Sequence, residues 1–117
     1  MAWQRNGRKY NNKITECDGH KFHSKKEASR YLDLKILEKA GEISDLILQP
    51  KFTFPIRYIH SHRLGKKATY TADFQYKERT GEIAVEDVKS KATAKTEAYK
   101  LKKALMKYFF DITVIEV

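Results

Sequence analysis

An aspartate and a lysine at the end of an apolar run are the residues of this chain best suited to chemistry. The run 83–85 leads into Asp87 and Lys89, and the alternating segment 69–76 carries a second aspartate, Asp73. Residues two apart in a strand share a face, so we expect Asp87 and Lys89 to project together. If the two segments pair about the turn between them, Asp73 and Asp87 approach each other at one end of a sheet.

These side chains match the ligands that a magnesium ion requires. Mg²⁺ binds hard oxygen atoms and usually keeps several waters, with one or two carboxylates and a substrate phosphate completing its shell. We expect Asp73 and Asp87 to be ligands, with the Val88 carbonyl as a backbone ligand and Mn²⁺ able to replace Mg²⁺. Glu27, in the first turn of a helix, can hold a second ion or orient a water. Lys89 can orient the attacking water or neutralise developing charge on a phosphate.

Each of these residues also has a purely structural interpretation. Asp87 and Lys89 can form a simple ion pair at a strand end, and Asp73 can be a surface acid beside a turn. Glu27 completes a capping box at the start of its helix, a duty that explains it without catalysis. Glu86, on the opposite strand face from Asp87, can be solvated. The placement on strands and the surrounding positive charge favour the catalytic interpretation.

The composition indicates a single folded domain with an anionic partner. At 117 residues and 41% hydrophobic content, the chain is long enough for one domain with a core. The 24 lysines and arginines exceed the 15 acids by enough to give a net charge of +9, which favours nucleic acid over an anionic membrane. Cys17 is the only cysteine, which excludes an internal disulfide. The sequence has no apolar signal segment and no run that could cross a membrane, so we expect a cytoplasmic protein.

Basic residues gather in two segments that we expect to contact DNA. One is the acid-free N-terminal arm, and the other is the lysine-rich start of the second long helix, where backbone N–H groups can bind a phosphate. A solvated helix face is the alternative for the second segment. The expected DNA-contacting residues are Arg5, Arg8, Lys9, Lys91, Lys95, Thr96, Tyr99, Lys102 and Lys103.

Periodicity and turn signals predict an α/β fold with a central mixed β-sheet flanked by helices. A flexible basic arm over 1–13 precedes a single domain over 14–117. We expect the last strand to lie parallel to the strand at 82–89, because a crossover helix precedes it. The expected elements are a hairpin at 14–22, helices at 24–40 and 96–108, strands at 43–48, 52–56, 69–76, 82–89 and 111–117, and loops at 60–67 and 90–95. The apolar stripe expected on the second helix is Ala98, Leu101, Ala104, Leu105 and Tyr108.

Five segments together resemble a family of small phage and prophage proteins of the PD-(D/E)XK nuclease superfamily, near the phage Holliday-junction endonucleases. The segments are 24–28 (SKKEA), 48–52 (LQPKF), 70–74 (YTADF), 85–89 (VEDVK) and 96–102 (TEAYKLK). The resemblance implies a restriction-endonuclease-like core in the order α-β-β-β-α-β. It also places Glu27, Asp73, Asp87 and Lys89 on the acid, aspartate, second acid and lysine positions of that superfamily.

The residues and the resemblance lead to one expectation with two rivals. We expect a Mg²⁺-dependent endonuclease that cuts branched or other structured DNA during phage recombination or replication, in the cytoplasm of a bacterial host. A homodimer would supply the second site that a symmetric junction needs. The first rival is a non-catalytic DNA-binding module that keeps the nuclease fold, and the second is an RNA-binding protein.

Overall fold

The computed structural model describes residues 14–60, 62–89 and 94–117. The chain begins there with a short hairpin of strands β1 (Thr15–Cys17) and β2 (His20–Phe22). Asp18 and Gly19 connect the strands with positive φ angles of 57° and 80°, as a tight hairpin turn requires. The expected hairpin is confirmed, whereas the expected arm at 1–13 lies outside the described residues.

Helix α1 (Lys25–Lys39) begins and ends as its sequence predicts. The Ser24 hydroxyl accepts a hydrogen bond from the Glu27 N–H at 3.1 Å, which caps the first turn. Glu27 in turn accepts the N–H of His23 at 2.8 Å, one residue before the position of a standard capping box. Gly41, with φ of 80°, follows the last turn and lets the chain leave the helix.

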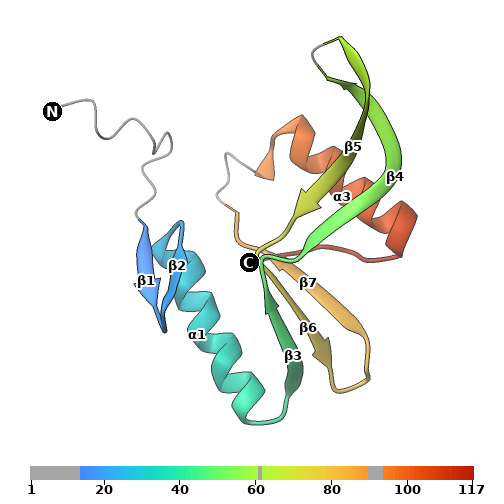
Figure 1. Ribbon diagram of the computed structural model, residues 1–117. Helices are drawn as coiled ribbons and strands as arrows, with labels where there is room; N and C mark the ends of the chain where they lie inside the picture. The colour runs from blue at the N-terminus through green and yellow to red at the C-terminus, as the bar shows by residue number, and fades with distance from the viewer. Residues whose placement is uncertain (1–13, 61, 90–93) are drawn as a thin grey trace, which may run out of the picture.

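A four-stranded mixed sheet forms the centre of the molecule (Figure 1). Its strands are ordered β3 (Ile43–Leu48), β6 (Phe74–Glu78), β7 (Ile83–Asp87) and β8 (Ile115–Glu116). The first three are antiparallel neighbours, and β8 runs parallel to β7 after the crossover helix α3 (Glu97–Phe110). The mixed sheet and the parallel last strand are therefore confirmed, although β8 covers only two residues of the expected strand at 111–117.

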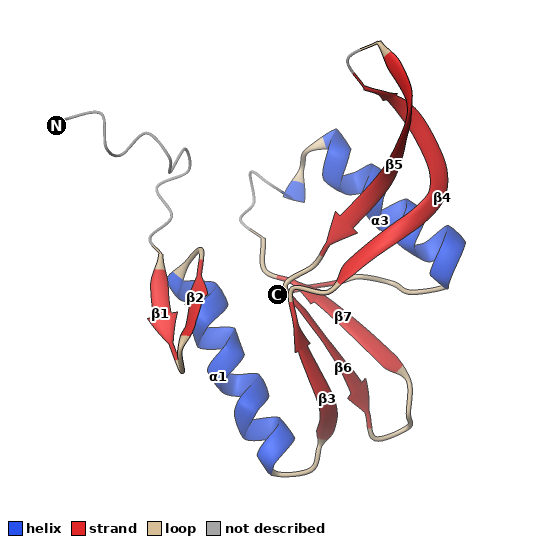
Figure 2. Ribbon diagram, viewed as in Figure 1, coloured by secondary structure: helices blue, strands red, loops and turns tan. Residues whose placement is uncertain are grey.

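A separate two-stranded ribbon corrects two sequence predictions. Strands β4 (Lys51–His60) and β5 (Arg63–Thr71) pair with each other alone, so the expected loop at 60–67 is too long and residues 63–67 are strand. The predicted strand at 69–76 is also wrong as a single element, because it breaks at Ala72 and Asp73 into β5 and β6. Figure 2 shows the ribbon pointing away from the four-stranded sheet.

The alternation across that break did predict burial, but it serves two cores. Tyr70 and Ala72 belong to one buried cluster, while Phe74 and Tyr76 belong to the other. Strand β7 likewise divides its neighbours Ala84 and Val85 between the two clusters, since adjacent strand residues face opposite sides. The cluster with α1 contains Phe22, Ala28, Tyr31, Leu34, Ile43, Phe74, Tyr76 and Ala84. The cluster with α3 contains Phe54, Tyr70, Ala72, Val85, Tyr99, Met106 and Val114.

The buried face of α3 differs from the predicted stripe. Leu101 and Tyr108 are 60% and 81% exposed, and the fully buried positions are Tyr99 and Met106. These two are seven residues apart, about two turns, and therefore share one helix face. The helix is thus rotated from the expected orientation, with Tyr99 and Met106 in the same buried cluster as Val85 of β7. Neither described helix has the length and apolar character needed to cross a bilayer.

Candidate active site

Three acidic residues from three elements meet at one end of the central sheet. Glu27 lies in the first turn of α1, Asp87 is the last residue of β7, and Asp73 occupies the break between β5 and β6. Glu27 and Asp87 are buried, and Asp73 is half-buried. Asp73 is close enough to the carboxyl groups of both other acids for each of them to affect its pKa. The structure therefore brings together the three acids named from the sequence.

Main-chain hydrogen bonds hold Asp73 in this position. Its N–H donates to the Glu86 carbonyl at 3.1 Å, and its carbonyl accepts the Gln49 N–H at 2.9 Å. Its carboxylate accepts the Val88 N–H at 2.7 Å. Because Asp73 lies outside the strands, its side chain is not confined to one face of the sheet, and it can contact an acid on either side.

Burial and the neighbouring carboxylates make this cluster difficult to ionise. Loss of solvent and the adjacent Glu27 together raise the pKa of Asp73 to about 6, opposed by hydrogen bonds with Asp87 and Val88. Burial and the carboxyl of Asp73 raise the pKa of Asp87 to about 7, opposed by Tyr70 and Lys89. At neutral pH the two aspartates therefore compete for a proton, which a nearby cation would displace.

Lys89, the lysine expected to act together with the three acids, lies directly beside this cluster. The Lys89 Nζ is 3.4 Å from the Asp87 Oδ1, so the expected proximity of the two is confirmed. Strand β7 ends at Asp87, so Lys89 lies beyond the strand. The predicted strand at 82–89 is therefore two residues too long at its C-terminal end. The same Nζ lies 4.8 Å from the centre of the Tyr99 ring, whose face attracts the cation. On the other side of Asp87, the Tyr70 hydroxyl donates to its Oδ2.

The carboxylates form a row rather than a closed metal cage. Across residues 14–60, 62–89 and 94–117, no three His, Cys, Asp or Glu side chains are arranged to ligate one ion. Mg²⁺ seldom uses such a cage, since one or two carboxylates with waters and substrate phosphates suffice. Asp73 and Asp87, hard oxygen donors with raised pKa values, fit that requirement. The carbonyl oxygen of Val88 was expected to be a metal ligand. In the structure, the Val88 N–H donates a hydrogen bond to the Asp73 carboxylate.

Glu86 has a role that sequence reasoning missed. It faces away from Asp87, as expected, but it is 1% exposed instead of solvated. Arg30 donates two hydrogen bonds to its carboxylate, at 2.8 and 2.7 Å, and Tyr76 donates a third at 2.5 Å. These bonds raise the pKa of Arg30 above its ordinary value. Both Glu86 oxygens are therefore engaged by the protein, which assigns this acid to holding α1 on the sheet.

The position of Arg30 in the helix could have indicated from the sequence that it lies near Glu27. It lies three residues after Glu27, and residues three apart are neighbours on a helix surface. The helix that delivers Glu27 to the cluster is thus fixed to β7 one turn further on. Loss of one partner from a buried ion pair costs about 3–5 kcal/mol, so this contact is a strong constraint on the site.

The residues expected to bind DNA at the start of α3 differ in their exposure and in their partners. Lys95 is exposed and Lys102 is half-buried, whereas Lys103 forms an ion pair with Glu116 at 2.7 Å. The Thr96 hydroxyl caps the helix by accepting the Tyr99 N–H at 3.3 Å. Tyr99 is only 6% exposed, so the expectation that it lies on the exposed helix start is wrong. Arg5, Arg8, Lys9 and Lys91 lie outside the described residues.

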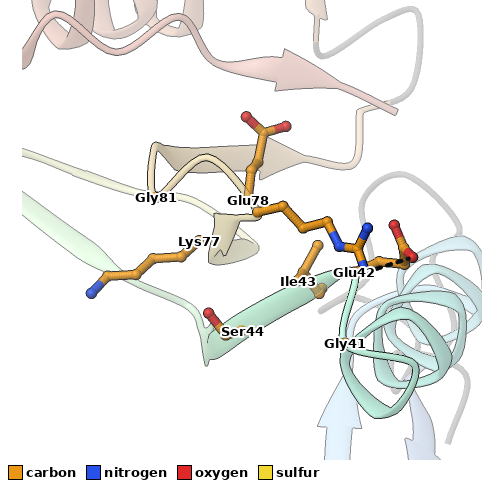
Figure 3. Close-up of a pocket in the computed structure, with 8 residues that line it drawn as sticks. Gly41, Glu42, Ile43, Ser44, Lys77, Glu78 and Gly81 are labelled. Carbon is orange, nitrogen blue, oxygen red and sulfur yellow. Dashed lines mark ion pairs between the residues drawn. The ribbon is translucent and has the colours of Figure 1, made fainter.

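A pocket at the other end of the sheet is unrelated to this cluster. It has a volume of about 320 Å³ and lies beside the pairing of Ile43 with Glu78, opposite the end that carries Asp73. Arg79 forms an ion pair with Glu42 there, at 3.7 Å. Figure 3 shows Glu42 among the residues that line the pocket. Its charged side chains are exposed, and Lys77 also forms an ion pair, with Asp45. The carboxylate row remains the stronger candidate for chemistry.

A family model described as "Protein of unknown function (DUF1064)" matches residues 7–115, and the chain belongs to that family. The comparisons with curated proteins and with solved structures gave no match.

Proposed function

We propose that this protein is a Mg²⁺-dependent DNA endonuclease with a restriction-endonuclease-like core. The observation that carries the proposal is the row of Glu27, Asp73 and Asp87, with Lys89 at 3.4 Å from Asp87. Structural carboxylates are normally paired with cations or kept apart, because burying like charges together is unfavourable. Functional sites are the usual place for such an arrangement.

Each residue has a distinct role in phosphodiester hydrolysis. Asp73 and Asp87 would hold Mg²⁺, which stabilises the negative charge that develops on the phosphate in the transition state. Glu27, at the other end of the row, orients the attacking water or binds a second ion. Lys89 places its charge beside the phosphate, and the Tyr99 ring keeps its ammonium group in position. Tyr70 holds the Asp87 carboxylate through its hydroxyl.

The proposed substrate is DNA, because the net charge of +9 suits a polyanion. Branched or otherwise structured DNA, cut during phage recombination or replication in a bacterial cytoplasm, follows from the resemblance to phage junction endonucleases. A homodimer would place two such sites on a symmetric junction.

A cleavage assay tests the proposal directly. The wild-type protein is incubated with duplex, single-stranded, flap and four-way-junction DNA, with Mg²⁺, with Mn²⁺ or with EDTA. We expect metal-dependent cutting of at least one structured substrate and none with EDTA. Metal-independent binding without cutting of any substrate would replace the nuclease by a non-catalytic DNA-binding module.

Thermal melting gives a second prediction, which does not depend on finding the substrate. Carboxyl groups whose pKa is raised on folding stabilise the protein only while they keep their protons. Since the pKa is about 6 for Asp73 and about 7 for Asp87, the folded state should lose stability as the pH rises from about 4 to 7. We expect the melting temperature without metal to be several degrees lower at pH 8 than at pH 5.5. Mg²⁺ should recover that loss at pH 8, because it binds the folded state.

The control for this prediction is the double variant Asp73→Asn and Asp87→Asn. Both asparagines can still accept the hydrogen bonds from Val88 and Tyr70. The pH dependence of melting should be smaller in the double variant than in wild type, and Mg²⁺ should not raise its melting temperature. Equal responses to pH and to Mg²⁺ in the two proteins would exclude this pair as the cation site.

A further inference from the structure

The β4–β5 ribbon is the most one-sidedly charged part of the described structure. Residues 51–71 contain no aspartate or glutamate and five lysines and arginines. The positive residues are Lys51, Arg57, Arg63, Lys66 and Lys67. An acid-free segment of this length is a surface on which only anions can neutralise the charge.

The pairing of the two strands brings like charges together. Arg57 lies directly opposite Lys67, and Tyr58 lies directly opposite Lys66. Like charges at directly opposed positions destabilise a two-stranded sheet. Arg57, Lys66 and Lys67 are all exposed, so this repulsion would be relieved by an external anion. The guanidinium of Arg57 is held in place by a hydrogen bond to the Gly65 carbonyl.

Exposed apolar side chains accompany these cations. Ile56 and Ile59 are 38% and 70% exposed. No other described strand pairs with either side of the ribbon. Phe52 and Phe54, nearer the base, instead pack against Phe110 of α3. The ribbon is therefore anchored at its base and presents both apolar and basic groups at its outer half.

The base of the ribbon is connected to the carboxylate row. The Ala72 N–H donates to the Pro50 carbonyl at 3.0 Å, and the Gln49 N–H donates to the Asp73 carbonyl at 2.9 Å. Tyr70, near the end of β5, donates its hydroxyl to Asp87. Whatever the outer half binds is thus held in a fixed direction from the proposed catalytic residues.

We propose that the β4–β5 ribbon is a duplex-DNA-binding arm that lies in the major groove beside the bond to be cut. The position relative to the cut rests on the proposed function, whereas the binding itself does not. A two-stranded ribbon fits the major groove of B-form DNA, where isoleucine side chains can contact thymine methyl groups. The outer half, about five residues of strand, extends about 17 Å, roughly half a turn of the duplex. The narrow, deep major groove of A-form RNA would not admit it.

Salt-dependent binding tests this arm. A triple ribbon variant, Arg57→Gln with Lys66→Gln and Lys67→Gln, is compared with a control variant, Lys39→Gln with Lys77→Gln and Arg79→Gln. Both variants remove three positive charges, and the control positions are at the opposite end of the central sheet. Affinity for a DNA duplex is measured against salt concentration in EDTA, so that no bond is cut. Melting temperatures confirm that all three proteins are folded.

We expect the ribbon variant to lose affinity at least tenfold for duplex DNA. The slope of log K against log salt should fall in magnitude by about 2–3, because each phosphate contact contributes about 0.9. The control variant should keep the wild-type slope to within one contact. An unchanged slope in the ribbon variant, or equal losses in both variants, would overturn the proposal.

Two further comparisons identify the partner and separate this inference from the proposed function. Equal or tighter binding of an RNA duplex, with the same dependence on the ribbon, would overturn the assignment to DNA. If the ribbon variant aggregates but binds DNA normally, the lysines serve only to keep the open strand edges from pairing with other chains, and the proposal is overturned. Because binding is measured without metal, a wild-type protein that never cuts DNA would refute the nuclease and leave the ribbon result interpretable.

Discussion

The variant Asp87→Asn is expected to lose cleavage by at least about 10²–10³-fold, the usual effect of removing one group that stabilises a transition state. Asparagine has the size of aspartate and can still accept the hydroxyl of Tyr70, so the fold should be kept. The substitution removes the negative charge that pairs with Lys89 and that is proposed to bind Mg²⁺. Cleavage rates and DNA affinities are measured on the same preparation. Affinity should stay within a few fold of wild type, because many phosphate contacts determine it.

A matched control is Asp45→Asn, which makes the same chemical change on an exposed residue of β3. Asp45 is 3.5 Å from Lys77 in an exposed ion pair, which contributes little. Its variant should cleave as fast as wild type. Normal cleavage by Asp87→Asn would exclude Asp87 from the proposed site. Lys89→Ala is expected to be as inactive as Asp87→Asn. If Asp87 were excluded, Lys89 would have no partner in the proposed site.

The sequence predicted the proximity of Asp87 and Lys89 because it depends only on local spacing. Residues two apart in a strand share a face, and the Lys89 ammonium group reaches Asp87 although the strand ends at Asp87. The cap of α1 was equally predictable, since Ser24 and Glu27 interact within one turn. Local hydrogen bonds and turn residues thus defined the positions of two of the three carboxylates along the chain.

The ribbon and the break at Asp73 depend on long-range packing and were not predictable in the same way. Alternation from Tyr70 to Tyr76 has the same pattern whether one strand or two produce it. The distinction arises from the two cores, because Ala72 is buried against α3 whereas Phe74 is buried against α1. The polar composition of 60–67 suggested a loop, yet residues 63–67 pair with β4, which provides partners for their backbone groups.

The orientation of α3 was missed for a related reason. Leucine and alanine define the stripe with the higher hydrophobicity, but Tyr99 and Met106 are the α3 residues buried in the cluster with Val85 of β7. Tyr99 also contacts Lys89, so the helix face that enters the core is the one that supports the proposed catalytic lysine. The burial of Tyr99 is thus linked to the position of Lys89, a contact that hydrophobic periodicity alone does not predict.

Glu27→Gln separates catalysis from helix capping at the third acid. Glutamine can still accept the His23 N–H, and the Ser24 bond uses only the backbone of residue 27, so the cost in stability should stay within about 1 kcal/mol. The variant also removes the charge that helps to raise the pKa of Asp73, which makes Asp73 easier to ionise. If Glu27 binds an ion or orients the water, cleavage should fall by at least about 10²-fold while the protein melts near the wild-type temperature and binds DNA normally.

The matched control for this variant is Glu97→Gln in the first turn of α3. That residue is also a first-turn acid favoured by the helix dipole, but its side chain is almost fully exposed and its ion pair with Lys100 is long, at 3.9 Å. Its loss should leave cleavage unchanged, which isolates the position of Glu27 from its effect on helix stability. Full activity in Glu27→Gln would restrict this residue to capping, and Asp73, Asp87 and Lys89 would then have to bind the metal and position the water without it.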